Sequence, residues 1–443
     1  MSWRRLIVLL LVLAVIAVPA VALRAMCVGN SCDRVTGGAP RVPFCPLPDD
    51  LKSDLAAGYR EGRSPDVLAV TRAPSVWGPA DASASLSPWP SLGGDRGTEV
   101  PIVFAGTGID PSVALPDGTT LDEIAPTVAD AIGFDRPFPS VRSGHAVLGL
   151  ASDERPRLVL EVALKGVGSG TLEEQPGAWP FLGSLIGEGA GTTVGLTASL
   201  PVDPTATLTT IGTGGLPSQH GITGTFVRND DGLVTEAWGP AAPVSIIATL
   251  PDDWDEQTDQ RARIGLVATA GSDRGLTGGT WYPGHDRDRV LIGTGRAAVD
   301  ATRELLASGF GRDDVTDILG VVLDGSLTSM DQHLRQIVEL ARAAAPGSVL
   351  VVVAGIGPTA GPGPSAAGLR DLMTQVEDQV PGDRPVIAQA VTGGFFLDQT
   401  TLTAGGITGQ AVVDATLDAT SPDGETMTAD AFQGFAVSFA RYC

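Results

Sequence analysis

The sequence predicts an α/β fold: a three-layer sandwich in which helices cover both faces of a mostly parallel central sheet. Short apolar runs, typical of buried strands, alternate along the chain with segments that have helical periodicity. Strands that are buried on both faces belong to parallel sheets covered by helices. The 443 residues are enough for one large α/β domain or two smaller ones, and no internal repeat is visible.

The predicted strands are runs of aliphatic residues, and the predicted helices carry apolar residues at three- and four-residue spacing. From the N-terminus, the strands are 66–70, 101–106, 157–164, 192–200, 263–270, 317–324, 348–355 and 385–391. The helices are 121–132, 204–214, 296–309, 329–345 and 366–380. Stretches rich in proline and glycine near 28–50, 74–97 and 357–366 are predicted as loops or linkers.

An export signal opens the chain. Arg4 and Arg5 precede an apolar run from Leu6 to Leu23, which is long for a signal peptide and short for a membrane span. The small residues 20–22 offer a cleavage site, whereas Pro19 and the length of the run leave an uncleaved anchor open. Residues 1–26 are therefore predicted as a signal peptide or an N-terminal membrane anchor, followed by an extracytoplasmic linker over 27–44. Both readings place the rest of the chain outside the cytoplasm, secreted or held at the membrane.

Four cysteines suit an oxidising compartment. They are Cys27, Cys32, Cys45 and Cys443, and they allow three pairings. A local Cys27–Cys32 bridge would leave Cys45 and Cys443 to join the two ends of the chain. The alternative is that all four are free thiols.

The formal net charge of −22 predicts an acidic surface. Such a surface repels polyanions, so binding to nucleic acid or to anionic lipid through charge is disfavoured.

The segment Val202–Gly224, VDPTATLTTIGTGGLPSQHGITG, resembles the nucleophile region of the alkaline phosphatase superfamily, in its phosphodiesterase and nucleotide pyrophosphatase branch. The resemblance implies a Thr or Ser nucleophile at the start of a helix. That position is Pro204 here, between Asp203 and Thr205, and proline offers no nucleophile. The residues that match the family pattern are Thr209, Thr210, Thr213, Gly214, Pro217, His220, Gly221 and Gly224.

The resemblance also implies two divalent cations, usually zinc, and the positions of their ligands are altered. Lys165, one of only two lysines in the chain, stands where the first ligand Asp is expected, and an ammonium repels a dication. Ala354 stands at the place of a ligand Asp-His pair. Asp324 is present at a third ligand position, but no His follows it within a few residues. The two-zinc site is therefore predicted to be lost, and neither a metal nor another cofactor is expected.

The order of the motifs indicates a circular permutation. Residues 100–144 resemble the closing segment of the family, whereas the opening segments start near Arg157. Residues 45–150 thus resemble the C-terminal part of the family and residues 157–443 its N-terminal part, within one alkaline-phosphatase-like α/β domain over 45–443. A bridge between Cys45 and Cys443 would restore the continuity that the permutation has cut.

The candidate residues for a degenerate pocket stand at or just after predicted strand ends, where sites of α/β sheets form. They are Lys165, Asp203, Pro204, Thr205, Asp324 and Ala354. The alternative is that they are ordinary loop residues of a fold whose pocket has closed. Of the four histidines, His220 is expected to be structural rather than a ligand.

Two functions follow from these residues. The favoured one is an exported, non-catalytic relative of phosphodiesterases and phosphatases with a binding or structural role at the cell envelope. Its partner would be an unknown envelope protein or a small anionic ligand attracted by Lys165. The alternative is an active phosphoric or sulfuric ester hydrolase with a rearranged metal site, in which Thr205 or Asp203 attacks and Asp324 and His220 contribute ligands.

Overall fold

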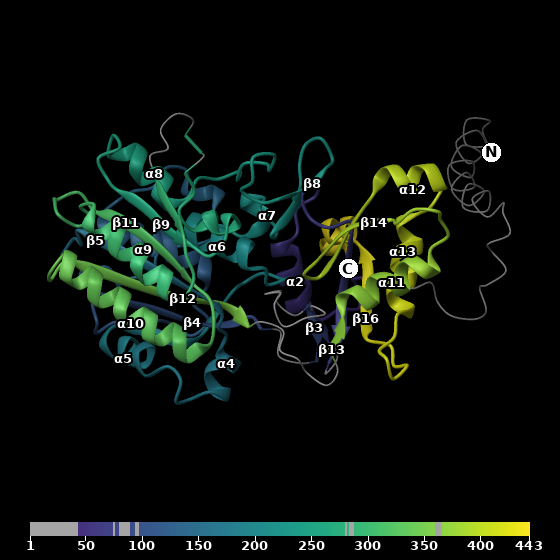
Figure 1. Ribbon diagram of the computed structural model, residues 1–443, viewed down its shortest axis with the longest axis horizontal. Coiled ribbons are helices and arrows are strands. Elements are labelled where there is room, and N and C mark those ends of the chain that lie inside the picture. Colours follow the sequence, from purple (N-terminus) through teal and green to yellow (C-terminus); the bar gives the residue numbers. More distant parts are fainter. Residues whose placement is uncertain are drawn as a thin grey trace, which may run out of the picture. The chain divides into compact units, whose positions relative to one another are not determined.

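Seven strands form the main sheet in the order β10-β9-β11-β5-β12-β4-β6 (Figure 1). The five strands from β10 to β12 are parallel, β4 is antiparallel to β12, and β6 is antiparallel to β4. The sheet is therefore mostly parallel, as predicted. The strands span β4 (Glu99–Gly106), β5 (Leu158–Gly166), β6 (Ala190–Leu196), β9 (Ile264–Ala268), β10 (Arg289–Ile292), β11 (Asp317–Leu323) and β12 (Val349–Pro358).

The structure is a computed structural model, and it describes residues 43–73, 76–78, 89–93, 97–279, 281–282, 288–358 and 366–443. The expected signal peptide or anchor and the cysteines at 27 and 32 lie outside these ranges. Among the helices described, none is both long and apolar enough to cross a bilayer.

Helices cover both faces of the main sheet, because its central strands are apolar on both sides. Figure 1 shows α6 and α8 on one side and α5 and α10 on the other. The first face packs against η2 (Leu121–Glu123), α3 (Ile124–Ile132), α6 (Pro204–Thr213), α8 (Leu250–Gln257) and η4 (Gly271–Leu276). The second face packs against α4 (Ser169–Glu174), α5 (Pro180–Glu188), α9 (Arg296–Ala307) and α10 (Leu327–Ala344). The three-layer α/β fold is thus confirmed.

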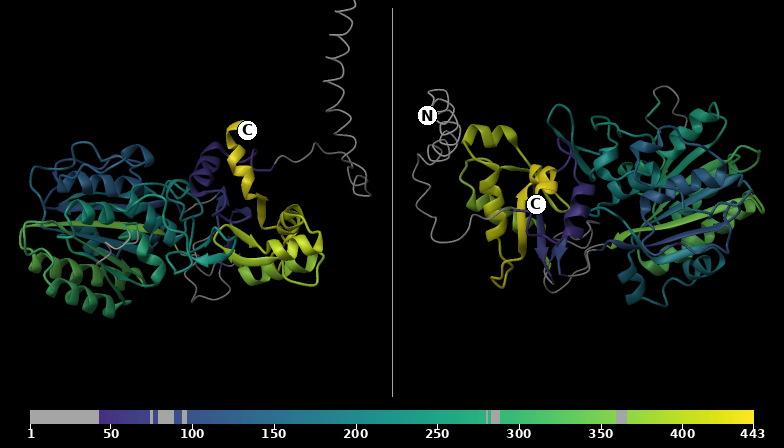
Figure 2. Two further views of the ribbon diagram at one scale, coloured as in Figure 1. Left: turned by 90° about the horizontal axis from the view of Figure 1, so that it is seen from above. Right: turned by 180° about the vertical axis from the view of Figure 1, so that it is seen from behind.

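A second sheet departs from the prediction of one central sheet. It has the order β14-β15-β1-β16, with β3 beside β1. The predicted strands 66–70 and 385–391 belong to this second sheet, because β1 pairs antiparallel with β15 and β16 near the C-terminus. In Figure 2 the purple start of the described chain lies beside its yellow end. The strands span β1 (Val67–Arg72), β3 (Ser91–Leu92), β14 (Ile387–Val391), β15 (Gly394–Leu397) and β16 (Thr428–Gln433).

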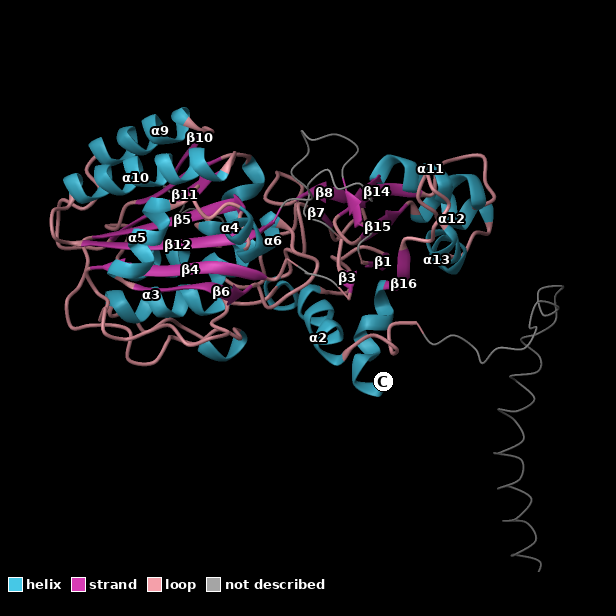
Figure 3. Ribbon diagram, turned by 90° about the horizontal axis from the view of Figure 1, so that it is seen from below, coloured by secondary structure: helices cyan, strands magenta, loops and turns pink. Residues whose placement is uncertain are grey.

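Helices from the C-terminal part pack on one face of the second sheet, and the two ends of the described chain pack on the other. Figure 3 shows α11, α12 and α13 together, with α2 beside the C-terminus. Their bounds are α2 (Asp49–Gly58), α11 (Leu369–Gln379), α12 (Gln399–Gly405), α13 (Gly409–Asp418) and η5 (Gly434–Tyr442). The remaining elements are η3 (Pro139–Val141), α7 (Pro217–His220), and the strand pairs β2 (Val76–Gly78) with β13 (Ala366–Gly368) and β7 (Phe226–Arg228) with β8 (Val234–Glu236).

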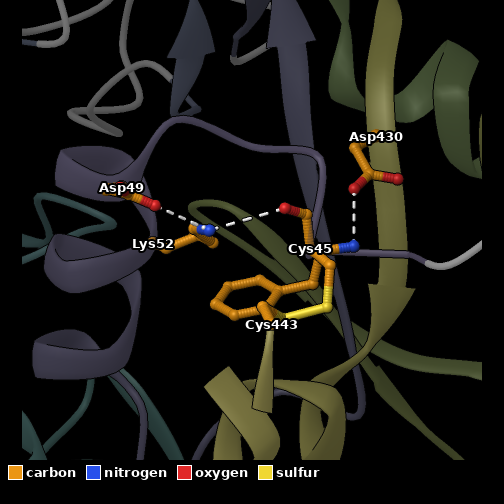
Figure 4. The surroundings of a disulfide bond; sticks show 6 residues. Cys45, Asp49, Lys52, Asp430 and Cys443 are labelled. Carbon is orange, nitrogen blue, oxygen red and sulfur yellow. Dashed lines mark hydrogen bonds and ion pairs between the residues drawn. A yellow bond between two sulfur atoms is a disulfide. The ribbon is translucent and has the colours of Figure 1, made fainter. Parts of the chain in front are cut away.

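A disulfide joins Cys45 to Cys443, which are 398 residues apart, with their Cα atoms 5.1 Å from each other (Figure 4). This is the pairing that the cysteine positions favoured. Beside it, the backbone N–H of Phe44 donates to Asp430 Oδ2 at 2.8 Å, and Lys52 Nζ lies 3.4 Å from the Cys45 carbonyl oxygen. The two ends of the described chain therefore meet, as the circular permutation requires, although the permutation itself remains a prediction.

Candidate functional site

Lys165 and Asp324 lie on neighbouring strands at the carboxyl edge of the main sheet, and Ala354 lies further inside it, opposite Ala163. Leu323 of β11 pairs with Leu164 of β5, so Asp324 and Lys165 are the next residues along two neighbouring strands. Ala354 lies in β12, on the other side of β5. Strand alternation places Lys165 and Asp324 on the face that α6 covers. The sheet thus brings the expected metal-ligand positions together.

Lys165 is held by an ion pair that the sequence did not reveal. Its Nζ lies 2.5 Å from Asp273 Oδ1 and 2.7 Å from Thr269 Oγ1. The Asp273 carboxylate also accepts hydrogen bonds from the Thr269 hydroxyl and from the backbone N–H groups of Thr269 and Ala270. The side chains of Lys165 and Asp273 are 10% and 0% exposed. Each charge is therefore compensated inside the protein, and the ion pair links the ends of β5 and β9.

Asp203 is the N-cap of α6. Its Oδ1 accepts from the backbone N–H groups of Thr205 at 2.9 Å and Ala206 at 3.4 Å. Pro204 occupies the first helical position, where a missing N–H is tolerated. Burial raises the pKa of the Asp203 carboxyl above its ordinary value, although hydrogen bonds from Thr225, Thr205 and Ala206 oppose that rise. The sequence DPTA thus forms a helix start here.

The Thr205 hydroxyl belongs to a short hydrogen-bonded chain. Its Oγ1 lies 3.1 Å from Thr225 Oγ1, which in turn lies 3.1 Å from Asp203 Oδ1 and 3.2 Å from Oδ2. Because the single Thr225 proton goes to the carboxylate, Thr225 accepts from Thr205. Thr205 is 2% exposed and Asp203 is 3% exposed. The two residues that could replace the missing nucleophile are therefore buried and engaged with each other.

The approach to the N-terminus of α6 is filled by other parts of the chain. The cavity beside Asp203 has a volume of about 10 Å³, and α2, the second sheet and the segment after α7 supply its walls. A Cβ added at Gly58 would lie 1.9 Å from the carbonyl oxygen of Leu200, and one at Gly393 would lie 2.9 Å from Pro201. Ligand pockets commonly measure several hundred cubic ångströms (about 300–1,000 Å³). An organic ester does not fit beside Asp203 in this structure.

The other expected ligand positions do not form a recognisable metal centre. Ala354 is 3% exposed and carries no donor atom, and Asp324 is half-buried at the end of β11. Within the described ranges, no three His, Cys, Asp or Glu side chains are grouped so that they could hold a metal ion.

His220 is a structural residue in this fold. It is fully buried, its Nδ1 accepts from the Ile222 backbone N–H at 3.1 Å, and its Nε2 lies 3.1 Å from Thr210 Oγ1. Burial, helped by the charge of Arg60, lowers the pKa of His220 to about 3. The ring is therefore neutral, with its proton on Nε2 directed at Thr210.

A second polar cluster closes the other end of α6, and sequence reasoning missed it. Arg136 and Arg142 both donate to the carbonyl oxygen of Thr213, the last residue of the helix, at 2.8 and 3.0 Å. Both also bind Asp253 Oδ2, at 2.9 and 3.0 Å. Burial and the neighbouring Arg142 lower the pKa of Arg136 to about 10, although Asp253 opposes the shift. Two guanidinium groups at a helix C-terminus stabilise its exposed carbonyl groups.

Glu161 is a further buried acid that the sequence reading did not single out. It lies in the middle of β5, is 2% exposed, and its Oε2 has no hydrogen-bond partner among the residues that the structure describes. Burial raises the pKa of Glu161 to about 8, although the charge of Arg136 acts in the opposite direction. The signal in the sequence is a single acid in the middle of an apolar run, Leu158–Leu164.

No family model matches the chain, and neither does any curated protein. Among solved structures, it is similar to a crystal structure of the wild-type alkaline phosphatase PafA, with 11% identity and a TM-score of 0.42 over 64% of this chain and 85% of that chain. A PafA variant with four substitutions gives 12% identity and a TM-score of 0.41, over 64% of this chain and 86% of that chain. Both neighbours are alkaline phosphatases, and the likeness is distant.

Proposed function

We propose that this protein is an exported, non-catalytic relative of metal-dependent phosphodiesterases and phosphatases, with a binding or structural role at the cell envelope. The observation that carries the proposal is the Lys165–Asp273 ion pair, with Nζ and Oδ1 2.5 Å apart. The resemblance places the first metal ligand at position 165. The Lys165 ammonium at this position neutralises the Asp273 carboxylate, which would otherwise attract a metal cation.

Two further observations support the same reading. Pro204 stands at the nucleophile position, and the flanking Asp203 and Thr205 bind each other and Thr225. The cavity beside Asp203 is about 10 Å³, too small for an ester substrate. A protein with this arrangement keeps the central sheet of the enzymes and binds its partner through another part of its surface.

The partner that we favour is an envelope protein rather than an anionic small ligand. Lys165 would be the cation for such a ligand, yet Asp273 and Thr269 already take two of its three N–H groups. A phosphate or sulfate would have to displace an internal carboxylate. The apolar run Leu6–Leu23 supplies export and, if it is retained, an attachment to the membrane.

The test is to measure metal content and ester hydrolysis on the purified exported region. The substrate is bis-p-nitrophenyl phosphate, with added zinc or manganese. We expect neither stoichiometric metal nor turnover. Metal at one or two equivalents, with turnover abolished by a chelator, would overturn the proposal in favour of a hydrolase with a rearranged metal site.

The Lys165→Asp variant sharpens this test. It adds a carboxylate beside Asp273 and near Asp324, so we expect it to bind zinc more tightly than the unchanged protein. Lys52→Asp is the matched control, because Lys52 is the other lysine and lies on α2, away from the sheet edge. If Lys52→Asp also binds zinc more tightly, the change in net charge, and not the position of the new carboxylate, explains the gain in zinc affinity.

A further inference from the structure

Among the buried hydroxyl groups that have no hydrogen-bond partner in the part of the chain that the structure describes, two line the same cavity. They belong to Thr223 and Thr392, which are 6% and 2% exposed. Thr223 follows α7, whereas Thr392 lies in the turn between β14 and β15 of the second sheet. Buried hydroxyl groups are nearly always paired, with protein or with an ordered water.

Both threonines line one cavity, the same one that lies beside Asp203. Its volume of about 10 Å³ is close to the smallest that holds one water molecule. Asp203, Tyr59 and Ser64 are further polar residues in the wall. A buried water typically makes two to four hydrogen bonds, which the two unpaired hydroxyl groups and the other polar residues of the wall can supply.

The residues that line this cavity favour an uncharged occupant. An anion would meet the buried carboxylate of Asp203. A cation needs several more oxygen atoms, and that carboxylate already accepts from Thr205, Ala206 and Thr225. An empty cavity of this size is expected only where the lining is apolar.

We infer that one water molecule is bound between Thr223 and Thr392, beside Asp203. It accepts from or donates to both hydroxyl groups and joins the turn of the second sheet to the N-terminus of α6. An internal water molecule thus occupies the place where the resemblance puts substrate chemistry, and it links the second sheet to the N-terminus of α6. This inference does not depend on the proposed function.

The first test is a crystal structure of the protein in its exported form, at a resolution that shows single waters. A solvent peak within hydrogen-bond distance of both hydroxyl groups is expected. A cavity without density would overturn the inference. So would an anomalous signal at this place after exchange of sodium and potassium for rubidium or thallium, because the occupant would then be a cation.

The second test uses hydroxyl-to-methyl substitutions of nearly equal volume. Thr223→Val and Thr392→Val each remove one partner of the water, so each should lower the midpoint of thermal unfolding by about 1–3 °C. The double variant should lose less than the sum, because both residues bind the same molecule. Thr277→Val is the control: its hydroxyl is also buried and has no partner within the described ranges, but it does not line this cavity.

In the control, removal of an unpaired hydroxyl should leave the midpoint unchanged or raise it. If Thr223→Val and Thr392→Val also raise the midpoint, the cavity is dry and the inference is wrong. If a variant fails to fold, the crystal structure of the unchanged protein decides the question by itself.

Discussion

Individual buried charges in this protein are compensated in different ways. Lys165 has Asp273, and Arg136 and Arg142 share Asp253. In the described part of the chain, Glu161 has no such partner for its Oε2, and burial therefore favours its neutral form. An acid of this kind makes the stability of the protein depend on pH.

Glu161 predicts a loss of stability as the pH rises. Its pKa is about 8 in the folded protein against an ordinary value of 4.5. Below pH 4.5 Glu161 is protonated in both the folded and the unfolded protein, so its contribution to the free energy of unfolding is fully present. Between 4.5 and 8 only the unfolded chain ionises, so the free energy of unfolding should fall by about 1.4 kcal/mol per pH unit through this residue.

The measurement compares urea unfolding of the unchanged protein and of Glu161→Gln from pH 5 to 8. The difference between the two isolates Glu161 from the other buried acids. Glu161→Gln should gain in relative stability as the pH rises. Parallel curves for the two proteins would contradict the pKa shift.

At the level of elements, α6 is the best-defined helix of the candidate site. All of its residues except Pro204 are buried, Asp203 binds its first N–H groups, and two arginines bind its last carbonyl oxygen. Helix ends that are buried need such partners, because water cannot supply them. Helix capping therefore accounts for the DPTA sequence.

Asp203→Ala should destabilise the protein by about 2–4 kcal/mol, because it removes the N-cap and leaves the Thr225 hydroxyl without its acceptor. Asp203→Asn keeps an amide oxygen as a cap and should cost clearly less. Urea unfolding of the three proteins at one pH measures this. Equal stability of the Ala and Asn variants would show that the cap hydrogen bonds are unimportant.

At the level of the whole molecule, the two ends of the described chain are joined twice: by β1 and β16, and by the Cys45–Cys443 bridge. Under the circular permutation that we propose, this is the place where the ancestral chain was continuous. A peptide connection here is geometrically feasible, since the two Cα atoms are 5.1 Å apart.

A rearranged chain tests the permutation. It begins at Glu154, runs to Cys443, continues through a short flexible linker to Cys45 and ends at Asp153. The new ends are exposed and lie between β4 and β5 in the chain, so the rearranged protein should fold with the same disulfide and a similar unfolding midpoint.

The control for this experiment is a chain with the same linker whose new ends lie between Val321 and Val322, inside the buried strand β11. It should fail to fold, because it breaks the centre of the main sheet. Failure of both chains would contradict the proposal that residues 157–443 and 45–150 form one continuous domain in that order.

Local patterns determine much of what the sequence says about this protein. All eight predicted strands and all five predicted helices are present, because runs of aliphatic residues and helical periodicity act over short distances. The mostly parallel sheet, the candidate positions at its carboxyl edge and the structural role of His220 follow from the same local information and from the family resemblance.

Only the tertiary structure decides which residues these elements meet. Lys165 pairs with Asp273, which lies 108 residues further along the chain. The backbone N–H of Phe44 binds Asp430, which lies 386 residues further along. The separation of the strands into two sheets depends on equally distant partners, such as β1 and β16. The cavity beside Asp203 also depends on distant segments, because its walls come from α2, the loop after α7 and the β14–β15 turn. Such contacts leave no periodic signal along the chain, because their energy comes from burial and pairing in three dimensions.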